Sequence, residues 1–358
     1  MNKCSLIDVH AMVDTDGKVR PCCRFNSLDY DMPDINDGLA AAVAGPVFSD
    51  IRQRMNNNER LDNCNKCWQQ EESTGNSMRT FYNDMYYPYN TVTLKYLEVG
   101  FSTHCNLACR MCSADYSSKW ATIMNPGKTV SVGYNLDVDA FDVDLSMINL
   151  IKIVGGEPMM APQHDKFVEK LLDGHCDLSK LTLVYFTNAT KMPTPSIISF
   201  WKKVKHVIVN FSIDGYNEVN EYQRPGHKWS TIQDTIDRYK LMSEEINITM
   251  YTHCVVTVLN VLHMKSFYKW HQETFGDNDS LSVDVTESPD HLSLRNQTAE
   301  FKERAITYIS ANVPYDLHRS RLIAFLQQPA RDNIEYTTDD IGKHERPLDE
   351  YFNQELKL

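Results

Sequence analysis

The sequence has no apolar segment near the roughly 18 to 20 residues that a membrane-spanning helix requires. Its first residues, MNKCSLIDVHAMVDTDGKV, lack the sustained apolar core of a secretory signal. The chain also lacks an excess of basic residues, because 48 Asp and Glu against 36 Lys and Arg give a formal net charge of -12. A general nucleic-acid binder would normally present a basic surface. We therefore expect a cytoplasmic protein that has neither a membrane nor a nucleic acid as its partner.

Cysteine, in contrast, is abundant and unevenly placed. The chain contains ten cysteines, and in the absence of a secretory signal so many indicate metal or redox chemistry more than disulfides. Cys176 and Cys254 stand alone, and we expect both to be core residues without a catalytic role. The other eight form two groups: Cys4, Cys22, Cys23, Cys64 and Cys67 near the N-terminus, and Cys105, Cys109 and Cys112 further along.

Residues 91–290 alternate between strand-like and helical patterns, and we find no internal repeat. Such alternation is typical of βαβ units with a parallel sheet. Six units predict an α/β fold with a partial (β/α)6 TIM-like barrel that is open on one side. The expected strands are 91–101, 150–155, 182–187, 206–213, 249–258 and 281–286, and the expected helices are 166–174, 196–204, 230–242 and 264–275.

Two smaller regions flank this barrel. Residues 1–75 predict a loop-rich module, with a turn at 14–17 between extended pieces at 8–13 and 18–20, and a helix at 45–57. A linker is expected over 76–90. Residues 291–358 predict a helical C-terminal extension, with its clearest helix at 297–311. The pattern leaves open whether this extension packs on the barrel or closes its open side.

The loop after the first barrel strand carries the spacing C-x3-C-x2-C, at Cys105, Cys109 and Cys112. Catalytic loops of β/α barrels lie at the carboxyl ends of strands, so the position suits chemistry. Iron–sulfur clusters normally take four thiolates, and a local fourth is absent here, so one iron could accept another ligand. A zinc site or inert thiols are the alternatives. Structural zinc usually has four ligands, and His104 is poorly placed to be the fourth.

This loop resembles that of the radical S-adenosylmethionine (radical SAM) superfamily, and the resemblance covers most of 91–290. It implies that Met111 lies near the adenine and that the open iron of a [4Fe–4S] cluster binds S-adenosylmethionine. In such enzymes an electron from the cluster breaks the sulfonium and gives a 5′-deoxyadenosyl radical, which abstracts hydrogen. The electron comes from a donor such as flavodoxin or ferredoxin.

Further family motifs follow at successive strand ends. Gly155, Gly156 and Glu157 match the GGEP motif, where glycine allows close backbone approach and a carboxylate can accept from an amino group. Arg224 matches the arginine that pairs with the methionyl carboxylate. The resemblance also implies cofactor contacts for Thr187, Asn188, Ser212, Asp214 and Asn260.

The N-terminal cysteines resemble the SPASM/twitch modules that hold auxiliary clusters. The matching residues are Cys4, then Asp16 to Val19, then Cys22 after Pro21, and the closing pair Cys64 and Cys67. Four cysteines suit one auxiliary [4Fe–4S] cluster, which favours the twitch form. The module departs from the family because it precedes the barrel. Cys23 is an alternative to Cys22, although the position after proline favours Cys22. A zinc ribbon is the other reading of the C-x2-C pair.

The resemblance predicts an enzyme, oxidoreductase-like, that modifies a peptide or protein substrate. The alternatives are a radical dehydrogenase or rearrangement enzyme acting on a small molecule such as an aminosugar, or an iron–sulfur or zinc protein without catalysis. No catalytic side chain is assigned. Glu98, Asp284 and Glu287 lie near strand ends and are candidates for proton handling.

Overall fold

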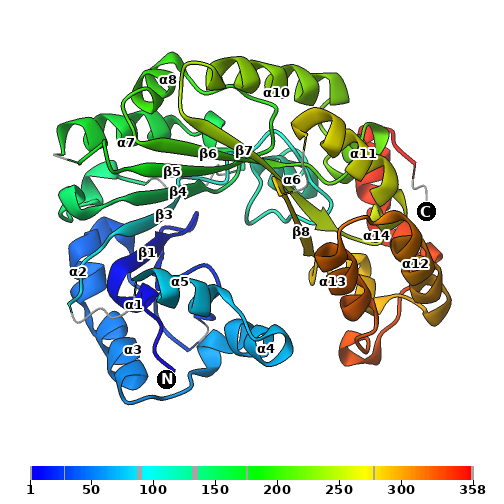
Figure 1. The fold of residues 1–358 in the computed structure, drawn as a ribbon, viewed down its shortest axis with the longest axis horizontal. Coiled ribbons are helices and arrows are strands. Elements are labelled where there is room, and N and C mark those ends of the chain that lie inside the picture. The colour runs from blue at the N-terminus through cyan, green and yellow to red at the C-terminus, as the bar shows by residue number, and fades with distance from the viewer. Residues whose placement is uncertain are drawn as a thin grey trace.

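A single curved sheet organises the chain in the computed structural model, which describes residues 2–27, 29–86, 91–130, 136–174, 176–276 and 279–355. The sheet has eight strands in the order β2-β1-β3-β4-β5-β6-β7-β8 (Figure 1). The strands are β1 (His10–Val13), β2 (Val19–Arg20), β3 (Tyr96–Gly100), β4 (Leu150–Val154), β5 (Thr182–Thr187), β6 (His206–Ser212), β7 (Ile248–Val256) and β8 (Leu281–Val285).

Strands β3 to β8 are mutually parallel and form the predicted partial (β/α)6 barrel, which confirms the expected fold class. Helices cover the convex face of the sheet, and the opposite face is turned inward (Figure 1). The covering helices are α7 (Pro162–Asp173), α8 (Pro195–Trp201), α10 (Trp229–Ser243) and α11 (Met264–Phe275), while α6 (Ser118–Met124) and α9 (Glu218–Gln223) are short and follow β3 and β6.

The alternation of burial along the strands explains which face holds the core. In β5 and β6 every second side chain is buried, and the intervening ones are half-buried. Tyr185 belongs to the buried set and accepts a hydrogen bond at its hydroxyl from Nε1 of Trp201 in α8, at 3.1 Å. The convex face therefore packs against aromatic and aliphatic helix residues. The inner face stays accessible to polar side chains.

The N-terminal segment joins the barrel through its strands. β1 runs parallel to β3, and β2 pairs antiparallel with β1, so the barrel sheet is extended by two strands. The predicted extended piece 8–13 begins as helix, because residues 6–9 form a buried turn, and the predicted linker is partly helical. The helices of this segment are α1 (Leu6–Val9), α2 (Leu39–Ala44), α3 (Pro46–Asn56), α4 (Asn65–Thr74) and α5 (Met78–Tyr86). Residues 87–90 of the predicted linker lie outside the described residues.

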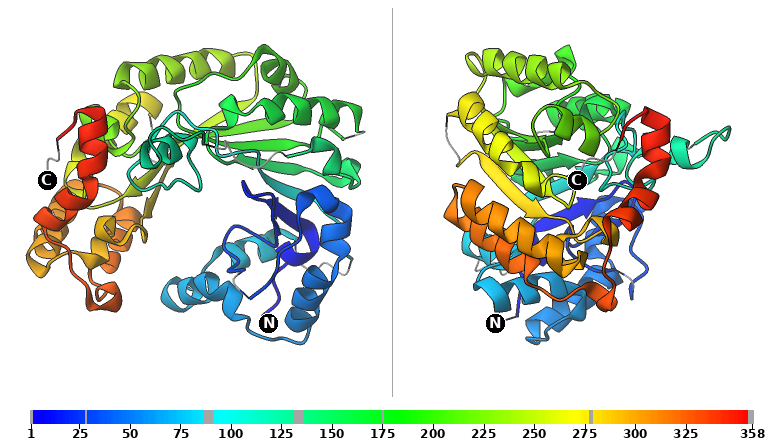
Figure 2. Two further views of the ribbon diagram at one scale, coloured as in Figure 1. Left: turned by 180° about the vertical axis from the view of Figure 1, so that it is seen from behind. Right: turned by 90° about the vertical axis from the view of Figure 1, so that its right-hand side faces the viewer.

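The C-terminal extension is helical, as predicted. It consists of α12 (Ala299–Asn312), α13 (Asp316–Leu326) and α14 (Thr338–Phe352). Figure 2 shows these helices beyond β8, at the end of the curved sheet opposite the N-terminal segment. They pack on the barrel, since α13 contacts β8 and α14 contacts the turn Asp290–Leu292. Among the described helices none is long and apolar enough to cross a membrane.

Candidate functional site

The three-cysteine loop is a compact turn at the carboxyl end of β3. The amide of Cys112 donates to the carbonyl of Cys109 at 2.9 Å, so the last two cysteines close one turn. The amide of Cys105 donates to Oγ of Ser118 at 3.1 Å, and Nε1 of Trp120 donates to the carbonyl of Cys109 at 2.8 Å. Helix α6 thus holds the loop from behind. All three thiols are half-buried.

Two residues from other strand ends reach the sulfur atoms of this loop. Nδ2 of Asn188, which follows β5, lies 3.8 Å from Sγ of Cys105. Nη1 of Arg224, which follows α9, lies 3.6 Å from Sγ of Cys109. N–H groups aimed at sulfur stabilise cysteine ligands in their thiolate form. The structure therefore brings together residues that the sequence separates by more than 80 positions.

Burial makes these thiols poor thiolates in the bare chain. Burial first, and the neighbouring thiol of Cys109 second, raise the pKa of Cys105 and of Cys112 to about 12. Metal ligation requires the deprotonated form, and a bound metal supplies the positive charge that stabilises it. The three thiols therefore suit an iron centre, because its positive charge would offset the negative charge of the thiolates.

The two glycines after β4 serve a close backbone contact. Gly155 has φ +120°, and a Cβ on Gly156 would lie 2.5 Å from the carbonyl oxygen of His104. The amide of Gly156 donates to the carbonyl of Ser102 at 2.9 Å, and that of Glu157 to His104 at 2.8 Å. The glycines thus let the β4 loop lie directly on the cysteine loop.

Glu157 is buried, and its carboxylate is occupied within the chain. It accepts hydrogen bonds from the hydroxyl of Thr187 and the amide of Asn188, each at 2.7 Å, and from the amide of Met159 at 3.2 Å. Burial raises the pKa of Glu157 to about 7, although these hydrogen bonds oppose the shift. Glu157 therefore fixes the segment that aims Asn188 at Cys105. Its expected contact with an amino group stays a prediction.

Asp214 is the centre of a second buried network. Its Oδ2 accepts from Nε of Arg224 at 2.6 Å, and its Oδ1 accepts from the amide of Val255 at 2.8 Å. Nδ2 of Asn260 donates to the carbonyls of Asp214, at 2.6 Å, and of Val255, at 2.9 Å. The predicted residues Asp214, Arg224 and Asn260 are therefore one unit. In the described contacts Asp214 bonds to Arg224 and to the backbone of Val255, and Asn260 bonds to the backbone of Asp214 and Val255.

The remaining predicted residues lie around the same end of the barrel. Ser212 ends β6 as a half-buried residue, in register with His253 of β7. Met111 packs against a small apolar cluster made of Val258, Leu259, Leu292 and Ile341. The side chain of Met111 thus has apolar surroundings, and its expected contact with the adenine stays a prediction.

The inner face of the sheet also carries two polar pairs that the sequence pattern does not reveal. Lys152 donates from Nζ to Oε1 of Glu98 at 2.9 Å, and Nε2 of His253 lies 3.0 Å from Oδ2 of Asp284. A charged or imidazole side chain inside an otherwise apolar strand is the signal that would have identified Lys152 and His253. Glu287, the third proton-handling candidate, pairs with Arg331 at 3.2 Å between exposed side chains.

Four of the N-terminal cysteines line one apolar cavity. They are Cys4, Cys22, Cys64 and Cys67, and the cavity is also lined by Leu6, Ile7, Pro21, Phe25, Met55, Met78, Arg24 and Arg79. Cys23 is exposed and does not line the cavity. Cys22 therefore shares the cavity with the other three thiols and Cys23 does not, while the choice of Cys22 as a ligand stays a prediction. In the described residues no three Cys, His, Asp or Glu side chains are gathered tightly enough for a single metal ion.

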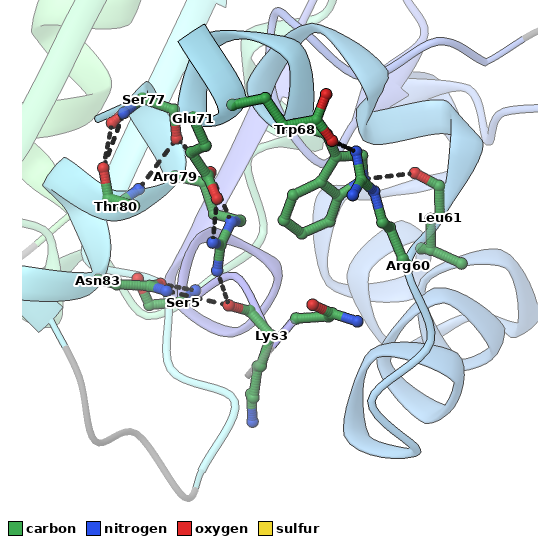
Figure 3. Close-up of polar contacts among 12 residues, drawn as sticks. Lys3, Ser5, Arg60, Leu61, Trp68, Glu71, Ser77, Arg79, Thr80 and Asn83 are labelled. Carbon is green, nitrogen blue, oxygen red and sulfur yellow. Dashed lines mark hydrogen bonds and ion pairs between the residues drawn. The ribbon is translucent and has the colours of Figure 1, made fainter. Parts of the chain in front are cut away.

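Arg79 holds the closing C-x2-C helix against the rest of this segment (Figure 3). Its Nε donates to Oε1 of Glu71 at 2.9 Å, and its Nη1 donates to the carbonyl of Lys3 at 3.0 Å. The guanidinium lies 4.5 Å from the ring centroid of Trp68, and Nε1 of Trp68 donates to the carbonyl of Leu61 at 2.8 Å. Helix α4, which carries Cys67, is thereby fixed at one wall of the cavity.

The isolated cysteines differ in burial. Cys254 is fully buried within β7, in agreement with its interpretation as a core residue, and burial raises the pKa of its thiol far above the usual range. Cys176 is half-buried and packs against the core, and burial raises the pKa of its thiol to about 11. Neither residue lines the cavity of the four N-terminal thiols.

Comparison with known families agrees with this arrangement. The radical SAM superfamily model matches residues 99–270, and the SPASM model, described as an iron–sulfur cluster-binding domain, matches residues 4–68. Curated proteins gave no match. Solved structures that resemble the chain include native anSMEcpe with bound AdoMet, at 19% identity and a TM-score of 0.44, covering 66% of this chain and 63% of that one.

Streptococcus suis SuiB bound to S-adenosylmethionine is also similar, at 13% identity and a TM-score of 0.40, covering 85% of this chain and 69% of that one. The chain spans 57% to 63% of the length of the anSMEcpe structures that it matches. Both matched models fall on the cysteine segments described above. Residues 99–270 therefore form a radical SAM domain, and a SPASM-type iron–sulfur domain precedes it over residues 4–68.

Proposed function

We propose that this protein is a radical SAM enzyme that cleaves S-adenosylmethionine reductively at a [4Fe–4S] cluster held by Cys105, Cys109 and Cys112. The observation that carries the proposal is the convergence of Asn188 and Arg224 on two of these three sulfur atoms. Residues that hydrogen-bond to the ligands of a metal site orient those ligands, so we expect Asn188 and Arg224 to support the same cluster.

The residues of the barrel would hold and orient the cofactor. When bound, the cluster and S-adenosylmethionine together supply a 5′-deoxyadenosyl radical. Arg224 offers a guanidinium to a carboxylate, and Asp214 fixes its direction through the buried ion pair. Met111 offers an apolar contact to the adenine, and Ser212 and Thr187 offer hydroxyls at neighbouring strand ends. Glu157 keeps Thr187 and Asn188 in place.

We propose that residues 1–75 act as an auxiliary module in which Cys4, Cys22, Cys64 and Cys67 hold a second [4Fe–4S] cluster. Four cysteines around one apolar cavity support full thiolate ligation, without an open iron. Arg24 and Arg79 line the same cavity. Arg79 is already paired with Glu71, so the guanidinium of Arg24 is the one that would offset the negative charge of a cluster with four thiolates.

The proposed substrate is a peptide or protein. The support is the SPASM-type domain, because its resemblance to auxiliary-cluster modules implies a peptide or protein substrate. The polar pairs on the inner face, Lys152 with Glu98 and His253 with Asp284, would offer polar contacts to a substrate entering the barrel. An external one-electron donor such as flavodoxin or ferredoxin would reduce the loop cluster.

Anaerobic reconstitution with iron and sulfide tests both clusters. Two [4Fe–4S] clusters require about eight iron atoms per chain, and the variant with Cys105, Cys109 and Cys112 changed to Ala should keep about four. After reduction with dithionite and addition of S-adenosylmethionine, the unchanged protein should form 5′-deoxyadenosine and the triple variant none. Cys176→Ala, at a half-buried position that does not line the cavity of the four N-terminal thiols, serves as the control. Formation of 5′-deoxyadenosine by the triple variant, or zinc in place of iron, would contradict the proposal.

A further inference from the structure

One side chain of the cysteine loop points away from the thiols and is completely enclosed. Arg110 stands between Cys109 and Cys112, and its side chain has 0% exposure. Its guanidinium lies 3.6 Å from the ring centroid of Tyr222. A buried guanidinium is strongly unfavourable unless carboxylates pair with it, so the partners of Arg110 decide whether the loop can adopt this conformation.

Those partners come from the end of the chain. Nη1 of Arg110 donates to Oε2 of Glu345 at 2.7 Å, and Nη2 donates to Oδ1 of Asp349 at 2.7 Å. Nη2 also donates to Oε1 of Gln354 at 2.9 Å. Glu345 and Asp349 lie one turn apart on α14 and face the loop together. Glu345 is additionally 2.7 Å from Nε2 of His291, which ties α14 to the turn after β8.

Arg110 also connects the cysteine loop to the segment that ends in Arg224. The amide of Arg110 donates to the carbonyl of Gln223 at 2.9 Å, and its Nε donates to the carbonyl of Tyr222 at 2.6 Å. Gln223 is followed directly by Arg224, whose Nη1 lies 3.6 Å from Sγ of Cys109. The register between the thiols and Arg224 therefore depends on Arg110.

An apolar contact joins α14 to the same site independently of these charges. Ile341 is buried and forms a cluster with Val258, Leu259 and Leu292, against which Met111 packs. Met111 is the residue assigned to the adenine. One face of α14 therefore lies behind the cysteine loop at two points, one polar and one apolar.

We propose that α14 forms a wall of the S-adenosylmethionine site, and that Glu345 and Asp349 are positioning residues that hold Arg110 and keep the cysteine loop in register with Arg224. The inference rests on the proposed function of that loop. It gives the C-terminal extension a role in cofactor binding, and it predicts that changes on α14 alter a site more than 200 residues earlier in the sequence.

The test compares charge-neutral, isosteric variants of α14. Glu345→Gln combined with Asp349→Asn removes the ion pairs and retains the shape of both side chains. Glu350→Gln, an exposed position on the same helix, is the matched control. Arg110→Lys keeps the positive charge and loses the planar fork, so it should give an intermediate effect. Each protein is reconstituted anaerobically, and its iron content and thermal unfolding are recorded before use.

Two measurements report on the site directly. The first is the change in the electron paramagnetic resonance spectrum of the reduced protein when S-adenosylmethionine is added, and the second is the equilibrium affinity for S-adenosylmethionine. Loss of an outer partner of a metal ligand shell typically costs about 10- to 100-fold. We expect that loss of affinity, and a matching fall in 5′-deoxyadenosine formation, for the double variant. The control should match the unchanged protein, and the auxiliary cluster should be retained in all variants.

The outcomes separate this inference from the proposed function. If the double variant binds and cleaves S-adenosylmethionine like the unchanged protein, or if the control loses as much as the double variant, the inference is wrong. If the unchanged protein itself shows no spectral change and forms no 5′-deoxyadenosine, the proposed function fails first. Should the double variant unfold, the single Asp349→Asn variant carries the test, because Asp349 is 16% exposed and Glu345 remains paired.

Discussion

Arg224 donates from Nε to Oδ2 of Asp214 at 2.6 Å, and Asp214 is fully buried. This ion pair leaves the Nη1 atom of the same guanidinium directed at Sγ of Cys109. The ion pair therefore orients Arg224 toward the cysteine loop.

Removing the charge of Asp214 should affect both stability and cofactor affinity. Asp214→Asn leaves a buried guanidinium without its carboxylate, which typically costs about 3 to 5 kcal/mol of unfolding free energy. We expect a loss of that order in denaturant unfolding, together with roughly 10- to 100-fold weaker binding of S-adenosylmethionine. Glu245→Gln, in the exposed pair with Lys202, should leave both measurements unchanged. Equal effects in the two variants would contradict a special role for Asp214.

Cys22 and Cys23 form a matched pair of neighbours with different surroundings. Cys22 lines the cavity with Cys4, Cys64 and Cys67, whereas Cys23 is exposed. Cys22→Ala should therefore lower the iron content from about eight to about four atoms per chain, and Cys23→Ala should retain about eight. Colorimetric iron analysis after anaerobic reconstitution measures this difference. The opposite pattern would assign the ligand to Cys23.

Gly156 should not tolerate a side chain. A Cβ there would lie 2.5 Å from the backbone oxygen of His104 and 2.7 Å from the carbonyl carbon of Thr103, so Gly156→Ala must displace the cysteine loop, at a cost of about 1 to 3 kcal/mol. We expect lower thermal stability and loss of the loop cluster with retention of the auxiliary one. Gly127→Ala is the control for backbone strain alone, because Gly127 has φ +77° but a Cβ there meets nothing within 4 Å; it should lose some stability and retain both clusters. Normal iron content in Gly156→Ala would contradict this prediction, because it would show that the loop can shift and still hold its cluster.

The buried His164 predicts a pH dependence of stability. Burial lowers the pKa of His164 from 6.5 to about 4, and its ring contacts the carbonyl of Pro158 and the hydroxyl of Tyr185. Between pH 4 and 6.5 the unfolded chain binds a proton at His164 that the folded chain does not bind. This contribution to stability is therefore fully present above pH 6.5 and is lost as the pH falls, by about 1.4 kcal/mol per pH unit.

Denaturant unfolding between pH 5 and 7 checks this sign. His164→Gln should lower the unfolding free energy at pH 7, and should reduce the slope of that free energy against pH over this range by roughly 1 kcal/mol per unit relative to the unchanged protein. Comparing the two proteins cancels contributions from other groups. A variant with the same slope as the unchanged protein would mean that His164 is not neutral in the folded state.

Much of the fold followed from local patterns. Strands such as Thr182–Thr187 and helices such as Met264–Phe275 appear where periodicity places them, because their alternation is the direct consequence of one buried face. Helix α5 was missed: it is amphipathic, but its apolar residues Phe81 and Met85 are exposed and its buried side chain is Arg79. That arginine is compensated by Glu71, a contact that no local pattern reveals.

The sequence by itself determined the chemistry of this protein. Three cysteines at fixed short spacing, and glycines and carboxylates at strand ends, identify a cluster loop because ligand type and local spacing are properties of the chain. Only the tertiary structure decided which groups complete the site. It placed Cys22 and not Cys23 at the cavity of the N-terminal thiols, turned Glu157 inward to hold Asn188, and brought Glu345 to Arg110. Those arrangements depend on burial and on contacts between distant segments, which exist only in the folded chain.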